Sequence, residues 1–257
     1  MKKLLLLFAV MLLASCVFAE EEVDLVYKFK ENANHKFKER TKITLNAEVM
    51  GESINSVSQT LIDIDETVLS GGETGKVRQV SEVVESVLDD NNNLDNIPVE
   101  DRKTTVTYEM NKRGKTLNIV DEKGETFPGF VASEVTPIFP DKKVKVGDTW
   151  EWKRNVDGGK VKAKCTLEKL YSKDGVDIAK IKLDFDDVIK ETIEEGVESP
   201  ETKVKGTGEF YYAVNYGNDL YIAYTIDFET HMESQSDEGV GEASLKTTYE
   251  YTYWRYK

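Results

Sequence analysis

The sequence contains little cysteine and little histidine. Its 257 residues include two of each, namely Cys16, Cys165, His35 and His231. Because Cys16 lies in an N-terminal segment with the character of an export signal, Cys165 has no partner and no internal disulfide is expected. The two histidines are far apart in the sequence, and no ligand spacing of a zinc site is present. We therefore expect no metal site and no cofactor.

Positive charge is outnumbered by negative charge. The chain has 34 Lys and Arg residues against 48 Asp and Glu residues, which gives a formal net charge of −14 at pH 7. Proteins that bind nucleic acids or anionic membrane surfaces neutralise phosphates with Lys and Arg. The balance therefore argues against nucleic acid as a partner. Acidity alone indicates a well-solvated surface and does not point to a cationic ligand.

Short catalytic and metal-binding motifs are missing. There is no G-x-S-x-G elbow, and Ser70–Val77 lacks the first Gly and the metal-binding hydroxyl of a phosphate loop. Asp89–Glu100 has oxygen ligands at the spacing of a calcium loop, but Leu94 stands where the sharp turn needs Gly and no amphipathic helices flank it. We interpret that run as a solvated linker. The sequence predicts a protein that is not an enzyme.

The first residues have the layout of a bacterial secretory signal. Lys2 and Lys3 precede the apolar run Leu4–Leu13, and Val17–Ala19 places small or apolar residues before a cut ahead of Glu20. The apolar run is shorter than the roughly 20 residues of a transmembrane helix. We expect a signal peptide at 1–19, a mature domain at 20–257 without a transmembrane span, and an extracytoplasmic location.

A second interpretation of the same segment concerns lipidation. Leu13–Cys16 resembles the lipobox of bacterial lipoproteins, and that resemblance implies that Cys16 carries a lipid and ties the protein to a membrane. Only a few residues separate Cys16 from the strand-like run that begins at Val23, which leaves a short tether. The pattern favours the free protein, in the periplasm or secreted, with the lipid-anchored form as the alternative.

Apolar and polar residues alternate along much of the mature chain. The alternation starts at Val26–Lys30 and is typical of strands with one buried face. The clearest long runs are Val161–Leu170, Val176–Phe185, Gly208–Asn215, Leu220–Glu229 and Leu245–Trp254. Several exceed the usual strand length of about 5–6 residues. We predict a single all-β domain built as a large curved antiparallel meander or an open half-barrel of long strands.

Few and short helices are expected. The main candidates are Val131–Val135 and Val188–Glu195, while the apolar positions of Val80–Leu88 fit neither the helical nor the strand period. Two predicted hairpins, Tyr108–Ile119 and Tyr212–Ile222, share Tyr, Asn, Gly, Leu and Ile. This similarity raises two alternatives, a duplication with halves at 20–126 and 143–257, or chance.

The most distinctive block is Phe139–Trp150. It resembles the F-P-x-K-x-V-x-V-G-D-x-W segment of uncharacterised bacterial exported proteins and lipoproteins with β-rich domains. The resemblance covers this block strongly, and it implies an extracytoplasmic location without implying a reaction.

Alternating aromatic residues form the weak candidates for ligand binding. They are Trp150, Trp152, Tyr249, Tyr251 and Tyr253. Aromatic side chains usually pack in the core, so core anchors are favoured over a ligand groove. We expect a non-enzymatic binding or scaffold module of the cell envelope that acts on an unknown ligand or protein. The alternatives are a carrier of apolar ligands, resembling half-barrel envelope lipoproteins, and a glycan-binding or glycan-active protein.

Overall fold

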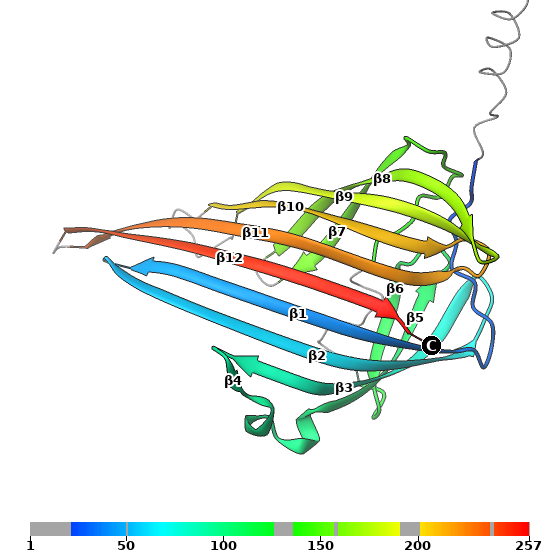
Figure 1. The fold of residues 1–257 in the computed structure, drawn as a ribbon, viewed down its shortest axis with the longest axis horizontal. Coiled ribbons are helices and arrows are strands. Elements are labelled where there is room, and N and C mark those ends of the chain that lie inside the picture. Colours follow the sequence, from blue (N-terminus) through cyan, green and yellow to red (C-terminus); the bar gives the residue numbers. More distant parts are fainter. Residues whose placement is uncertain are drawn as a thin grey trace, which may run out of the picture.

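The computed structural model describes residues 22–49, 51–125, 136–156, 159–190, 201–236 and 239–256. Within these ranges all strands belong to one antiparallel sheet, which confirms the predicted all-β, open and curved architecture (Figure 1). The strands are β1 Asn34–Val49, β2 Glu52–Ser70, β3 Thr74–Leu88, β4 Asn91–Asn92, β5 Lys103–Asn111, β6 Thr116–Asp121, β7 Thr149–Val156, β8 Gly159–Lys173, β9 Val176–Lys190, β10 Glu201–Ala213, β11 Asn218–Ser236 and β12 Gly239–Arg255.

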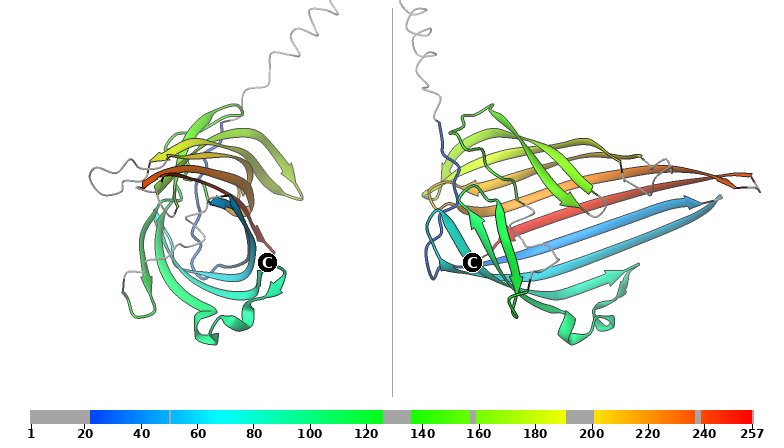
Figure 2. Two further views of the ribbon diagram at one scale, coloured as in Figure 1. Left: turned by 90° about the vertical axis from the view of Figure 1, so that its left-hand side faces the viewer. Right: turned by 180° about the vertical axis from the view of Figure 1, so that it is seen from behind.

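The first and last strands lie side by side in the middle of the sheet. The order is β6-β5-β3-β2-β1-β12-β11-β10-β9-β8-β7, and β4 pairs with β3 beside this path. The end-on view in Figure 2 shows that the sheet curls around an interior without closing. The chain thus forms two meanders, β1–β6 and β7–β12, which meet where β1 pairs with β12.

The helical content differs from the expectation. Two 3₁₀ turns, η1 Leu94–Asn96 and η2 Val99–Asp101, are the only helical elements in the described ranges. Val188–Lys190, the start of one helix candidate, belongs to strand β9 because the β9–β10 pairing continues through it. The remainder of that candidate and Val131–Val135 lie outside the described residues.

The ambiguous run Val80–Leu88 is the end of strand β3. Leu61 pairs with Glu85 and Ile62 with Val83, so Val84 is an extra residue in a β-bulge. The bulge exchanges the inward and outward positions in the last third of the strand. The apolar residues of β3 therefore follow no single period.

The two faces of the sheet differ in chemistry. Outward-facing side chains form cross-strand ion pairs, as in Lys42–Glu250 at 2.8 Å and Lys246–Glu229 at 3.1 Å. Inward-facing side chains are mostly apolar and aromatic. The largest that are fully buried are Trp152, Tyr212, Tyr251, Tyr253, Phe210, Leu25, Leu167, Ile181, Leu183, Ile222 and Ile226. This division follows directly from the alternation in the sequence.

Strands β10 and β11 approach each other closely at two glycines. A Cβ atom at Gly206 would lie 2.2 Å from the carbonyl oxygen of Thr225, and one at Gly208 would lie 2.4 Å from the Cβ of Tyr224. Both glycines face inward, and Gly208 pairs directly with Tyr224. Inward glycines of this kind let a sheet bend sharply, and a cross-strand aromatic ring covers the space that they leave.

One end of the curled sheet is filled by chain segments that are not strands. We call residues 22–33 the N-terminal segment and the end of the sheet that it fills the capped end. Val23 forms an isolated bridge with Val144, and Leu25 and Tyr27 are buried. The ring of Tyr27 lies 5.3 Å from that of Phe139. The interior at this end is thus a packed core.

The prediction of a strand at Val26–Lys30 is wrong. This stretch is extended but crosses the capped end instead of joining a strand ladder. The amide of Tyr27 donates to the carbonyl of Lys112 at 2.8 Å, and that of Lys28 donates to the carbonyl of Gly217 at 3.0 Å. These two carbonyls belong to different hairpin turns, so no single neighbouring strand can extend the pairing.

The two similar hairpins are confirmed as hairpins, β5–β6 and β10–β11. Their turns contain Gly114 with φ +89° and Gly217 with φ +69°, a region that favours glycine. They flank the N-terminal segment and supply the two carbonyls that it binds. The shared glycines Gly114 and Gly217 thus both lie against the N-terminal segment, while duplication and chance stay open as explanations of the similarity.

Candidate functional site

The inner face of the sheet away from the capped end is the first candidate site. Four polar residues face inward there, namely Ser56, Ser58, Thr230 and Thr247. The apolar residues that face inward among them include Ile43, Leu45 and Ala47 of β1, Ile54 of β2, Leu88 of β3, Phe228 of β11 and Leu245 of β12. We call them the distal inner face. Ile54 is 55% exposed and Leu88 is 42% exposed. Among the residues that the structure describes, no helix or second sheet packs against this surface.

The length of the strands explains why this surface exists. Strands β2 and β11 each contain 19 residues, far more than the N-terminal segment can cover from the capped end. On β1 the apolar Ile43 and Leu45 alternate with the outward-facing Lys42 and Thr44. The alternation that builds the core at one end therefore continues outward and leaves apolar side chains partly accessible at the other.

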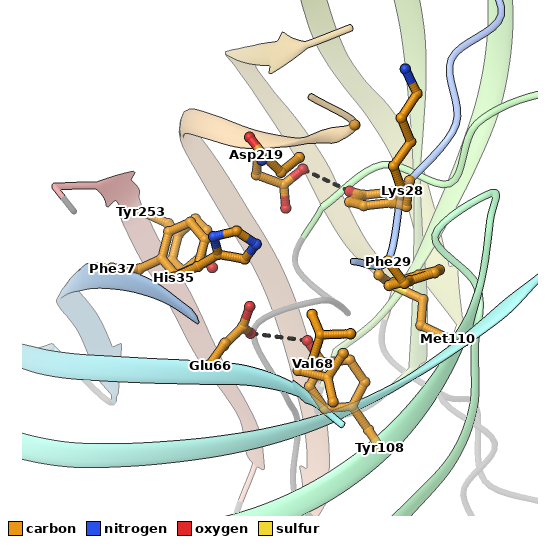
Figure 3. Close-up of a pocket in the computed structure, with 14 residues that line it drawn as sticks. Lys28, Phe29, His35, Phe37, Glu66, Val68, Tyr108, Met110, Asp219 and Tyr253 are labelled. Atoms are coloured by element: carbon orange, nitrogen blue, oxygen red, sulfur yellow. Dashed lines mark hydrogen bonds between the residues drawn. The ribbon is translucent and has the colours of Figure 1, made fainter. Parts of the chain in front are cut away.

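A buried polar cluster at the capped end is the second candidate. Tyr27, His35, Glu66, Tyr108 and Asp219 line one cavity of about 40 Å³ (Figure 3). The hydroxyl of Tyr108 donates to Glu66 at 2.9 Å, and that of Tyr27 donates to Asp219 at 2.7 Å. Each carboxyl side chain is only 8% exposed. The N-terminal segment, β1, β2, β5 and β11 thus bring together polar groups from most of the sheet.

Burial dominates the electrostatics of the cluster. Desolvation raises the pKa of Glu66 to about 7, although the hydrogen bond from Tyr108 opposes the shift. It also raises the pKa of Asp219 to about 7, against the hydrogen bond from Tyr27 and the charge of Arg255. Desolvation and, second, Arg255 lower the pKa of His35 to about 4. The neutral forms of all three side chains are therefore favoured near pH 6.

The size of the cavity limits its chemistry. A volume of about 40 Å³ is enough for about three water molecules, because one water needs roughly 10–15 Å³ on this measure. Glycoside hydrolysis needs two carboxyl groups placed on either side of a sugar ring. The cavity between Glu66 and Asp219 does not accommodate such a ring. Within the described ranges, no group of three His, Cys, Asp or Glu residues is arranged to hold a metal ion.

The structure places most of the predicted aromatic residues in the core. Trp152, Tyr251 and Tyr253 are 1–2% exposed. Trp150 is half-buried, and its indole Nε1–H donates to the carbonyl of Ile138 at 3.0 Å. Tyr249 is half-buried and stacks on other tyrosine rings.

Ring contacts connect Trp152 on β7 with Tyr251 on β12 across the sheet. Trp152 lies 6.2 Å from Phe185, Phe185 lies 5.6 Å from Tyr224, and Tyr224 lies 4.9 Å from Tyr251. Of the predicted set, Tyr249 is closest to the distal inner face, since it pairs with Ile43.

The two cysteines have different positions. Cys16 lies outside the described residues. Cys165 is fully buried, and burial raises the pKa of its thiol. A buried thiol with a raised pKa packs as a small apolar side chain, which is the role inferred from its strand-like surroundings.

Sequence reasoning missed the buried polar cluster. Along β2 every second residue faces inward, and Glu66 falls in the same series as Ile62, Ile64 and Val68. The alternation therefore contained a signal for an inward carboxyl. For Asp219 no such signal exists, because the register shifts between Tyr211 and Tyr212 and interrupts the alternation.

Comparison with known protein families and with curated proteins finds no match for this chain. Across the described residues, no helix is both long enough and apolar enough to cross a membrane.

Proposed function

We propose that the protein is a non-enzymatic binding module that holds an apolar ligand of the acyl-chain type on the distal inner face. The observation that carries this proposal is the one-sided chemistry of the distal sheet. Its outer face bears ion pairs such as Lys42–Glu250, while its inner face bears partly exposed aliphatic side chains. Exposed apolar surface with a polar rim marks binding sites in soluble proteins.

The shape of the site favours a slender ligand. The distal inner face lies on the inner side of a sheet that curls around an interior (Figure 2). A flexible hydrocarbon chain follows such a surface, and each methylene group that it buries contributes about 0.8 kcal/mol. The residues are aliphatic apart from Phe228, so stacking platforms for sugar rings are scarce here. These points support the carrier alternative over the glycan alternative.

The proposal is tested by measuring the binding of a fluorescent long-chain fatty acid to the full-length mature protein. Leu45→Asp should weaken binding at least tenfold, because it places a charge against the ligand on the distal inner face. Thr44→Asp is the matched control on the same strand and faces outward. It should bind like the wild type. Equal affinity of both variants, or no binding by the wild type, would contradict the proposal.

We also propose an extracytoplasmic location, on the signal-like pattern of Lys2, Lys3 and Leu4–Leu13. The intact mass of protein isolated from its native host should correspond to a chain that starts at Glu20. A mass that includes an acylated Cys16 would establish the lipid-anchored form. Retention of Met1 would exclude both the chain that starts at Glu20 and the lipid-anchored form.

A further inference from the structure

The N-terminal segment is held at the capped end by a small set of specific contacts. Tyr27 and Lys28 donate backbone hydrogen bonds to two hairpin turns, and the Tyr27 hydroxyl donates to Asp219. The segment also passes so close to several glycines that a Cβ atom there would lie 2.1–2.7 Å from Tyr27, Lys28 or Phe29. These glycines are Gly71, Gly75, Gly114 and Gly217. The capped end is therefore shaped to receive this segment.

The carboxyl groups of Glu66 and Asp219 lie beneath the N-terminal segment and have few charged neighbours that stabilise their ionised forms. Each accepts a hydrogen bond from a tyrosine, and Arg255 is the cation that acts on Asp219. Glu66 is disfavoured as an anion by the nearby charges of Asp219 and Asp65. Lys28 of the N-terminal segment also lines the cavity, and its ammonium group donates to the carbonyl of Asn215 at 3.1 Å. The other titratable and charged groups that face the cluster are Tyr212 on β10, Tyr253 on β12, His35 on β1, and Arg113 and Asp24 near Tyr212. Ionising both carboxyls would put two negative charges around one small cavity.

We propose that Glu66 and Asp219 form a proton-operated latch, which holds the N-terminal segment in the capped end when protonated and releases it when both ionise. Tyr27 joins the cluster to the segment, since it contacts Asp219 through its hydroxyl and Phe139 through its ring. Its hydrogen bond favours the ionised Asp219, but burial has the larger effect on the pKa of this carboxyl and acts in the opposite direction, so hydration of the released carboxyl drives the opening. Release would uncover Phe139 and Tyr212, whose ring lies 5.4 Å from that of Tyr27, and would give access to the interior from the capped end. This device is independent of ligand binding at the distal inner face.

The direction of the pH dependence follows from the raised pKa values of the two carboxyls. A released carboxyl ionises from about pH 4, whereas the latched one ionises only near pH 7. The latched state therefore loses stability as the pH rises from about 4 to 7, and the loss levels off above that. His35 acts in the opposite sense, because its pKa is lowered to about 4 and its protonation opposes the latch in acid. The two carboxyls together outweigh the one histidine.

The test is hydrogen exchange of the full-length mature protein at pH 5.5 and 8.5, corrected for the intrinsic exchange rate. Peptides that contain the amides of Tyr27 and Lys28 report opening of the segment. In the wild type each carboxyl should raise the opening equilibrium by about 30-fold between these pH values, as expected for groups that change from pKa 4 to about 7, while His35 should lower it by about tenfold. In Glu66→Gln/Asp219→Asn the rise should be absent, and the fall of about tenfold from His35 should remain.

The control is Asp227→Asn, which removes an outward-facing carboxyl from the same strand as Asp219. It should keep the pH dependence of the wild type. In each single variant, Glu66→Gln or Asp219→Asn, the rise of the opening equilibrium between pH 5.5 and 8.5 should be about 30-fold smaller than in the wild type. The single variants therefore test the proposal even if the double variant fails to fold. Unchanged pH dependence in the single variants would overturn the proposal. So would parallel deprotection of Ile181–Leu183 in the wild type, since that would indicate global unfolding.

Discussion

Replacing Trp152 with alanine should lower the free energy of unfolding by about 3–5 kcal/mol. Trp152 is 2% exposed, its ring contacts Phe185, and it lies on edge strand β7, where no further strand can compensate within the described residues. Truncation removes a large buried apolar surface and leaves a cavity that the rigid sheet fills only in part. A denaturant melt monitored by far-ultraviolet circular dichroism measures the change.

Tyr216→Ala is the matched control for this prediction. Tyr216 is an aromatic residue of the β10–β11 turn and is 58% exposed, so its truncation should change stability by less than about 0.5 kcal/mol. Trp150→Ala should fall between the two, because Trp150 is half-buried and loses its hydrogen bond to Ile138. A loss below about 1 kcal/mol for Trp152→Ala would mean that its ring is not part of a packed core.

Gly206→Ala should destabilise the protein by about 3 kcal/mol, at the upper end of the range for overpacking. The added methyl group would lie 2.2 Å from the carbonyl oxygen of Thr225 and 2.9 Å from the Cα of Ile226. Both are backbone atoms of the paired strand, so relief requires β10 and β11 to separate. The same denaturant melt measures the loss.

The control for Gly206→Ala is Thr207→Ala, at the next position on β10 and on the exposed outer face. It should cost less than about 1 kcal/mol, the whole span of strand propensities. Equal destabilisation by the two variants would show that the close approach at Gly206 leaves room for a methyl group.

The sequence predicted the architecture because a single physical signal dominates it. Alternation of apolar and polar residues over long runs, as in Val176–Phe185, fixes which face of each strand is buried. Glycines between the runs mark the reversals. Both signals are local, so the open, curved sheet of long strands is predictable without coordinates.

The elements that the sequence misassigned depend on tertiary contacts. Val26–Lys30 alternates like a strand, yet its amides bind the turns of two separate hairpins, an arrangement that involves residues up to about two hundred positions away. In β3 the bulge at Val84 removes the period on which the prediction depended. Local patterns do not contain this information.

The candidate sites were predictable to different degrees. The alternation of apolar and polar residues is enough to predict which aliphatic residues of the distal inner face point inward. It does not predict that no covering layer packs on them in the described ranges. The pairing of Glu66 with Tyr108 and of Asp219 with Tyr27 joins residues that are 42 and 192 positions apart. No spacing rule identifies such pairs, and only the curl of the sheet brings them to one cavity.

The location of the N-terminal segment also determines how the domain could be oriented at a membrane. The chain enters the fold at the capped end, and five residues separate Cys16 from Glu22. A linker of this length spans at most roughly 20 Å. If Cys16 is acylated, the capped end faces its own membrane, and the distal inner face opens on the opposite side, roughly 60 Å away for a strand of 19 residues. Such an orientation suits delivery across an aqueous gap to an acceptor, and it disfavours direct extraction of lipid from the membrane that anchors the protein.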